Sequence, residues 1–109
     1  MCPSEVSDIE ASIWQAYQDL GVRVWGIAPD DSIDQLERFR NHLGITFPIL
    51  IDDERLAISQ YEMLERDIPS ALYPQDWIIS PDGRIAYGNS IYEPDEMRAI
   101  LDTLLEESR

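Results

Sequence analysis

The chain is poor in the residues that most metal sites and many catalytic sites require. Its 109 residues include one cysteine, Cys2, and one histidine, His42. One cysteine excludes an internal disulfide and a zinc site built from cysteines. One histidine leaves histidine-cluster metal sites and Ser-His-Asp triads without support. We therefore expect neither a metal ion nor another cofactor.

Lysine is absent, and basic side chains are scarce. All eight basic residues are arginines, against 22 acidic residues, and the formal net charge is −14. Such a surface repels phosphate backbones and anionic lipid head groups, so we expect no nucleic acid and no membrane as partner. No apolar run approaches the roughly 18 residues of a membrane span. No signal peptide is visible after Met1, and the chain as given is expected in the cytoplasm.

The apolar pattern predicts one domain over residues 1–109, with helices and strands alternating. The predicted helices cover residues 3–20, 32–43, 52–61 and 93–105, and the predicted strands cover residues 22–28, 47–51, 77–79 and 84–87. This order is typical of an α/β domain with a mixed sheet and helices on both faces. Trp14, Trp25 and Trp77 are expected in or near the core.

The start of the first helix is open to two interpretations. Pro3 suits the first helical position, which leaves Cys2 just outside the helix. Alternatively, Ser7 caps the helix and Glu10 completes a capping box. In both cases Gly21 ends the helix.

Several segments also carry a family resemblance, in the same order along nearly the whole chain. They are Cys2-Pro3-Ser4-Glu5 at the head of the first helix, residues 22–31, residues 47–52 and residues 74–83. Together they resemble the thioredoxin-like redoxin superfamily. That superfamily includes thiol–disulfide oxidoreductases and peroxiredoxins of the alkyl hydroperoxide reductase–thiol-specific antioxidant type.

The resemblance implies roles for three residues. Cys2 would be the redox-active nucleophile, and Pro74 would follow a cis peptide bond and present the substrate's backbone. Glu5 would relay a proton beside Cys2 or, as we favour, serve the helix dipole. The expected partners are a thiol or disulfide protein, or a peroxide.

Two departures from the family pattern shape these expectations. The family's domain begins with strands before the redox helix, whereas only Met1 precedes Cys2 here, so we expect an N-terminally truncated thioredoxin-like sheet. If Cys2 is the second cysteine of a C-x-x-C motif, the first would lie upstream. The absent strand would lie between the strands at Val22 and Trp77. We expect homo-oligomers through the exposed strand edges; the alternatives are an upstream strand, or closure that brings Val24 beside Ile78.

The two ends of the chain favour different subfamilies. Cys2-Pro3-Ser4-Glu5 resembles the peroxiredoxin motif around the peroxide-attacking cysteine. Peroxiredoxins often have an arginine near the position of Pro74. This chain has a proline there, as thioredoxins do. We favour a thiol-dependent oxidoreductase that exchanges disulfides through Cys2. The alternatives are a one-cysteine peroxidase, and a non-catalytic thioredoxin-like interaction module or truncated remnant.

Overall fold

The structure is a computed structural model that describes residues 3–28, 31–52 and 75–107. The chain divides into two compact units, Met1–Met63 and Leu64–Arg109. The helix predicted after Asp52 lies outside the described residues, as do Cys2 and Pro74.

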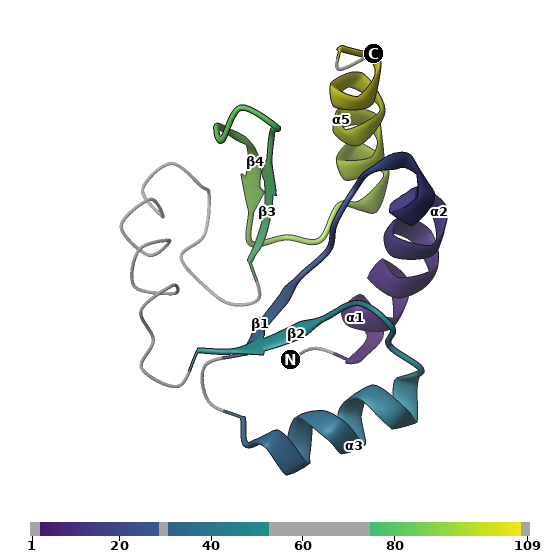
Figure 1. Cartoon of the computed structure of the whole chain (residues 1–109), viewed down its shortest axis with the longest axis vertical. Coiled ribbons are helices and arrows are strands. Elements are labelled where there is room, and N and C mark those ends of the chain that lie inside the picture. Colours follow the sequence, from purple (N-terminus) through teal and green to yellow (C-terminus); the bar gives the residue numbers. More distant parts are fainter. Residues whose placement is uncertain (1–2, 29–30, 53–74, 108–109) are drawn as a thin grey trace. The chain divides into compact units, whose positions relative to one another are not determined.

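The first unit opens with a long helical segment of changing pitch (Figure 1). It comprises α1 (Pro3–Ile9), the π-helical η1 (Glu10–Trp14), α2 (Gln15–Tyr17) and the 3₁₀-helical η2 (Gln18–Leu20). The segment ends at Gly21, whose φ of 98° lies in the left-handed region that glycine adopts without a Cβ penalty. The start at Pro3 and the end at Gly21 are confirmed. The alternative start at Ser7 is wrong, because Ser7 lies inside α1.

Helix α3 (Ile33–Leu43) has the ends that the sequence predicts. The Ser32 side chain accepts a hydrogen bond from the Gln35 amide, and the Gln35 side chain accepts one from the Ser32 amide. This capping box satisfies two amides that would otherwise lack partners at the helix start. Gly44, with φ of 69°, ends the helix.

Strands β1 (Gly26–Ala28) and β2 (Ile49–Ile51) form a parallel pair, with Ile27 opposite Leu50. Figure 1 shows the two strands side by side, with α3 below them. Backbone hydrogen bonds from the Gly26 amide to the Pro48 carbonyl and from the Asp52 amide to the Ala28 carbonyl, both 2.9 Å, flank the pair. Both strands are shorter than predicted, because residues 22–25 and 47–48 lie outside the ladder.

The core of the first unit joins its helices to β2. Val6, Ile45 and Phe47 are buried. The partly buried side chains packed against them are Ile9, Trp14, Val24, Phe39, Leu43 and Ile49. Trp14 is therefore near the core, as predicted. The same prediction was wrong for Trp25, which is 66% exposed, since its neighbour Val24 takes the place against the core.

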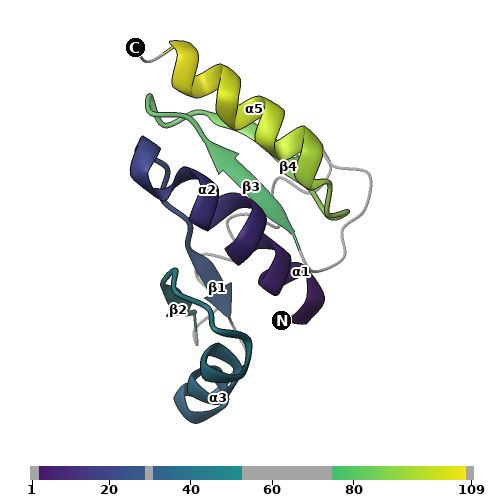
Figure 2. The same ribbon diagram turned by 90° about the vertical axis from the view of Figure 1, so that its right-hand side faces the viewer.

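The second unit is a hairpin with a closing helix. Strands β3 (Asp76–Ile79) and β4 (Ile85–Asn89) pair antiparallel, and α5 (Pro94–Glu107) contacts β4 (Figure 2). The Ser80 amide donates to the Arg84 carbonyl, and Gly83 has φ of 84°. A turn followed by a residue in the left-handed region is a common way to join two antiparallel strands. The predicted hairpin is confirmed, and so is the apolar face of the last helix, where Met97 and Leu101 are buried.

The described strands thus include one parallel and one antiparallel pair, with helices around them, which confirms the α/β class. Within the described residues β1 pairs with β2 in the first unit, and β3 pairs with β4 in the second. Val24 lies before β1, and the strand closure that would bring it beside Ile78 stays a prediction.

Candidate functional site

The structure describes one of the three predicted site residues. Cys2 and Pro74 lie outside the described ranges, so their proximity and the geometry of the Tyr73–Pro74 bond stay predictions. Glu5 lies in the first turn of α1 and is half-buried. A carboxylate in the first turn interacts favourably with the positive end of the helix dipole. The dipole role that we favoured for Glu5 stays a prediction.

The helix start itself has a clear local cause. Pro3 is the first residue of α1, where proline lacks only an amide that has no partner inside the helix. Val6, one turn on, is buried in the core and fixes the face on which the helix packs. The Cys2-Pro3-Ser4-Glu5 motif therefore leads directly into a helix that is anchored from its first turn.

Sequence reasoning missed a buried polar side chain of the first unit, Glu10. Glu10 is 8% exposed, and within the described residues it is the one buried charged side chain. A signal for this burial was present, because Val6, Glu10, Ile13 and Tyr17 recur at steps of four, three and four residues. All four are buried, so Glu10 occupies a core-facing position of the helix.

The Glu10 carboxylate receives hydrogen bonds from two segments. Its Oε1 accepts from the Thr46 amide at 2.5 Å, and its Oε2 accepts from the Thr46 hydroxyl at 2.7 Å and from the Gln15 side-chain amide. Burial raises the pKa of this carboxyl, but hydrogen bonds from Thr46, Gln15 and the Phe47 amide outweigh burial, so its pKa lies below the ordinary 4.5. Glu10 is therefore an anionic acceptor at neutral pH.

These bonds coincide with the π-helical turn. The Gln15 amide donates to the Glu10 carbonyl five residues earlier, which is the hydrogen bond that defines such a turn. The Trp14 indole Nε1 donates to the Thr46 hydroxyl at 2.9 Å, and the Gln15 Nε2 reaches the same hydroxyl at 3.2 Å. Glu10, Trp14 and Gln15 thus converge on one residue of the segment that precedes β2. We call these four residues the Thr46 network.

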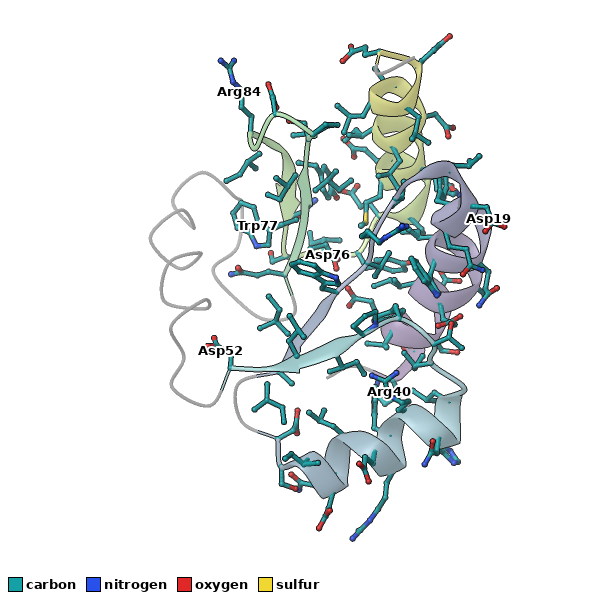
Figure 3. All side chains as sticks on the ribbon, viewed as in Figure 1. Asp19, Arg40, Asp52, Asp76, Trp77 and Arg84 are labelled. Atoms are coloured by element: carbon teal, nitrogen blue, oxygen red, sulfur yellow. The ribbon has the colours of Figure 1, made fainter. Side chains whose placement is uncertain are left out.

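The segment that holds Thr46 is itself well anchored. Ile45 and Phe47, on either side of Thr46, are 3% and 2% exposed. The Arg40 guanidinium, which points from α3 toward β2 in Figure 3, donates to the Ile45 carbonyl at 3.5 Å. Thr46 therefore offers its amide and hydroxyl to Glu10 from a fixed position.

A second polar group lies in the other unit, between β4 and the start of α5. Glu93 Oε1 accepts hydrogen bonds from the Asn89 side-chain amide and, at 3.5 Å, from the Tyr87 hydroxyl. Burial raises the pKa of Tyr87, and the carboxylates of Glu93, Glu96 and Asp76 raise it further against the opposing hydrogen bond with Asn89. Tyr87 therefore stays protonated at neutral pH and serves as a hydrogen-bond donor to Glu93.

The opposite face of the hairpin is shaped by Trp77. Asp76 and Trp77 lie on opposite sides of β3 (Figure 3). The Trp77 ring lies across Gly88, its register partner on β4, and the Trp77 Nε1 donates to Gln75 Oε1 at 3.3 Å. Glycine is required at this close approach because a side chain would meet the ring.

The described part of the chain shows neither a metal-binding cluster nor a membrane-spanning helix. Among residues 3–28, 31–52 and 75–107, no three His, Cys, Asp or Glu side chains gather so that they could hold a metal ion. Over the same ranges, no helix is long and apolar enough to cross a membrane.

These features define the class of protein. A helix that begins at a Cys-Pro-Ser-Glu motif, a following strand, and a C-terminal hairpin closed by a helix are the elements of a thioredoxin-like α/β protein. A family model described as the AhpC/TSA family matches residues 1–88, and the chain belongs to that family. Membership supports a thiol-dependent function of the redoxin type. A search of curated proteins found no significant match.

Proposed function

We propose that the protein is a thiol-dependent oxidoreductase in which Cys2 exchanges disulfides. The observation that carries the proposal is the family match over residues 1–88, which includes the motif Cys2-Pro3-Ser4-Glu5 at the head of the helix. The Cys2 thiolate attacks one sulfur of a disulfide RS–SR′, forms the mixed disulfide Cys2–S–SR and releases R′S⁻. The thiolate of an outside thiol then attacks the RS sulfur of the mixed disulfide, forms a new disulfide with it and releases the Cys2 thiolate.

The helix start supports this chemistry. A thiolate, not a thiol, is the nucleophile, and a helix N-terminus lowers a thiol pKa through its unpaired amides and its dipole. Pro3 is the first residue of α1, so Cys2 directly precedes that terminus in sequence. Glu5 and the net charge of −14 oppose a further negative charge nearby. The thiol pKa of Cys2 therefore reports directly which influence is stronger.

A second candidate is a one-cysteine peroxidase, favoured by the same family match and by the peroxiredoxin-like Cys-Pro-Ser-Glu motif. Here the Cys2 thiolate attacks a peroxide ROOH, forms the sulfenic acid Cys2–SOH and releases RO⁻, which takes up a proton. An outside thiol then condenses with the sulfenic acid, forming a mixed disulfide and water, and a second outside thiol reduces that disulfide.

The test begins with the rate at which iodoacetamide alkylates Cys2 at pH 6. We expect a rate at least about tenfold above that of a free cysteine, whose pKa is about 8.5. Because Cys2 is the one cysteine of the chain, the reaction has a single target. A rate no higher than that of free cysteine contradicts both catalytic candidates and favours a non-catalytic module.

Two substrates then separate the candidates by intact-protein mass spectrometry. A mixed disulfide formed with oxidised glutathione supports disulfide exchange, whereas trapping of a sulfenic acid by dimedone after hydrogen peroxide supports the peroxidase. The Cys2→Ser variant should do neither while keeping the far-UV spectrum of the wild type. Pro74→Ala should slow disulfide exchange and leave alkylation unchanged, because we propose that Pro74 presents the substrate's backbone.

A further inference from the structure

The Thr46 network lies at the π-helical turn η1, where the first helix changes its phase. An α-helix advances by about 100° per residue, so the extra residue in a π-helical turn rotates everything before it by about that angle. Residues Pro3–Ile9 precede the turn, and α2 follows it. The orientation of the first two turns relative to the rest of the helix therefore depends on whether the π-helical turn is kept.

The hydrogen bonds of the Thr46 network stabilise the π-helical turn. Glu10 and Gln15, the two ends of the π-helical backbone bond, are also joined through their side chains. Both also reach the Thr46 hydroxyl, which further accepts from Trp14. An α-helical turn in place of the π-helical turn would rotate Glu10 away from Thr46. A buried carboxylate without its donors is costly, so the network disfavours that rearrangement.

We propose that Glu10 and Thr46 are positioning residues, which hold the helix start in the orientation that activates Cys2. The proposal rests on the proposed function, since it assigns the network a role toward the Cys2 thiol. Loss of the network would let the first turns of the helix rotate or fray. The helix N-terminus would then stabilise the thiolate less well, and the thiol pKa of Cys2 would rise.

Thr46 permits a matched set of variants, because its own side chain is exposed. Thr46→Val removes the hydroxyl and keeps the shape and the backbone amide, whereas Thr46→Ser keeps the hydroxyl. Thr103→Val is the control, since Thr103 is also exposed and its hydroxyl donates within its own helix to the Ala99 carbonyl at 3.0 Å. Glu10→Gln removes the charge of the acceptor, and Gln15→Ala, at an exposed position, is the mildest change.

The measurement is the alkylation rate of Cys2 between pH 5 and pH 10 in each full-length variant. We expect Thr46→Val and Glu10→Gln to lower the rate at pH 6 by roughly three- to tenfold through a higher thiol pKa, because one pKa unit is tenfold in thiolate. Thr46→Ser and Thr103→Val should stay within about twofold of the wild type. Among the three threonine variants, only Thr46→Val should show faster hydrogen exchange in peptides from residues 3–20.

The outcomes are separable. If the wild-type thiol is activated and Thr46→Val leaves its pH profile unchanged, the network is merely structural and the positioning role is overturned. If the wild-type thiol titrates like free cysteine, the proposed function fails on that measurement alone. Should Glu10→Gln fail to fold, Thr46→Val and Gln15→Ala decide the matter, since both change exposed side chains.

Discussion

At the scale of single residues, the Glu10 carboxylate links stability to pH. Its pKa in the folded protein lies below the ordinary 4.5, because the hydrogen bonds from Thr46, Gln15 and Phe47 outweigh its burial. A group with a lowered folded pKa contributes stability above its unfolded pKa, and that contribution is lost as the pH falls through the folded value. The stabilisation by Glu10 should therefore be complete at pH 6, begin to fall near the ordinary pKa of 4.5 and disappear once the pH lies below the folded pKa.

The Glu10→Gln variant tests this linkage. At pH 6 we expect it to lower the free energy of unfolding by about 1–3 kcal/mol, since its side-chain amide offers one acceptor oxygen where the carboxylate offers two. The difference from the wild type should shrink as the pH is lowered toward 3. Urea unfolding across this range measures it, with Glu37→Gln, an exposed position on α3, as the control. A difference that stays constant between pH 6 and pH 3 would contradict the linkage.

The same residue shows what the sequence could reveal about the candidate site. The step pattern through Val6, Glu10, Ile13 and Tyr17 predicts that Glu10 faces the core. Its partner Thr46 lies 36 residues away, and no local rule connects the two. Cys2 and Glu5 were proposed from a motif, whereas the bonds between Glu10 and Thr46 become visible only when the helix and the segment before β2 are packed together.

At the scale of elements, the best-predicted ends are those set by local chemistry. Ser32 and Gly44 bound α3 because a capping box and a left-handed glycine act within a few residues. The π-helical turn could not be predicted, because bonds from distant Thr46 help to hold it. The length of β1 also depends on pairing with β2, so a run of apolar residues overstated it.

The β3–β4 hairpin makes a sharper prediction. A Cβ added at Gly88 would lie 2.6 Å from Cζ3 of the Trp77 ring, closer than non-bonded carbon atoms approach one another. Gly88→Ala must therefore push the ring or the strand aside, and we expect it to destabilise the protein by about 1–3 kcal/mol. The measurement is urea unfolding followed by far-UV circular dichroism.

A double-mutant cycle supplies the control for Gly88. In a Trp77→Ala background the added methyl group has no ring to meet, so Gly88→Ala should cost little there. The coupling between the two positions then isolates the contact between ring and strand. Equal costs in both backgrounds would mean that backbone conformation, not the Trp77 ring, requires glycine at this position.

At the scale of the whole molecule, the described strands leave backbone groups open to association. The Gly26 amide and the Ala28 carbonyl are used toward β2. Strand alternation therefore turns the amide and carbonyl of Ile27 to the other edge, where no ladder is formed within the described residues. Trp25 and Ile27, just before β1 and within it, are also exposed. Edges of this kind favour pairing with another chain.

The negative net charge of the chain opposes pairing between two copies, so the pairing should depend on the salt concentration. Two copies with a formal net charge of −14 each repel one another, and salt screens the repulsion, with a Debye length of about 10 Å at 0.1 M. We therefore predict self-association through the β1 edge at micromolar concentration, with an oligomer fraction that rises between low and moderate salt. Light scattering coupled to size exclusion measures the mass under each condition.

Two lysine variants locate the interface. Ile27→Lys places a charge at the edge strand and should make the protein monomeric, as natural edge strands use lysine against pairing. Ile33→Lys is the matched control, because Ile33 is 62% exposed on α3, away from the edge, and its replacement should leave the mass unchanged. A folded wild-type monomer at every salt concentration would contradict self-association. Equal loss of the oligomer in both variants would contradict an interface at the β1 edge, because each lysine makes the net charge of −14 less negative and so weakens the general repulsion.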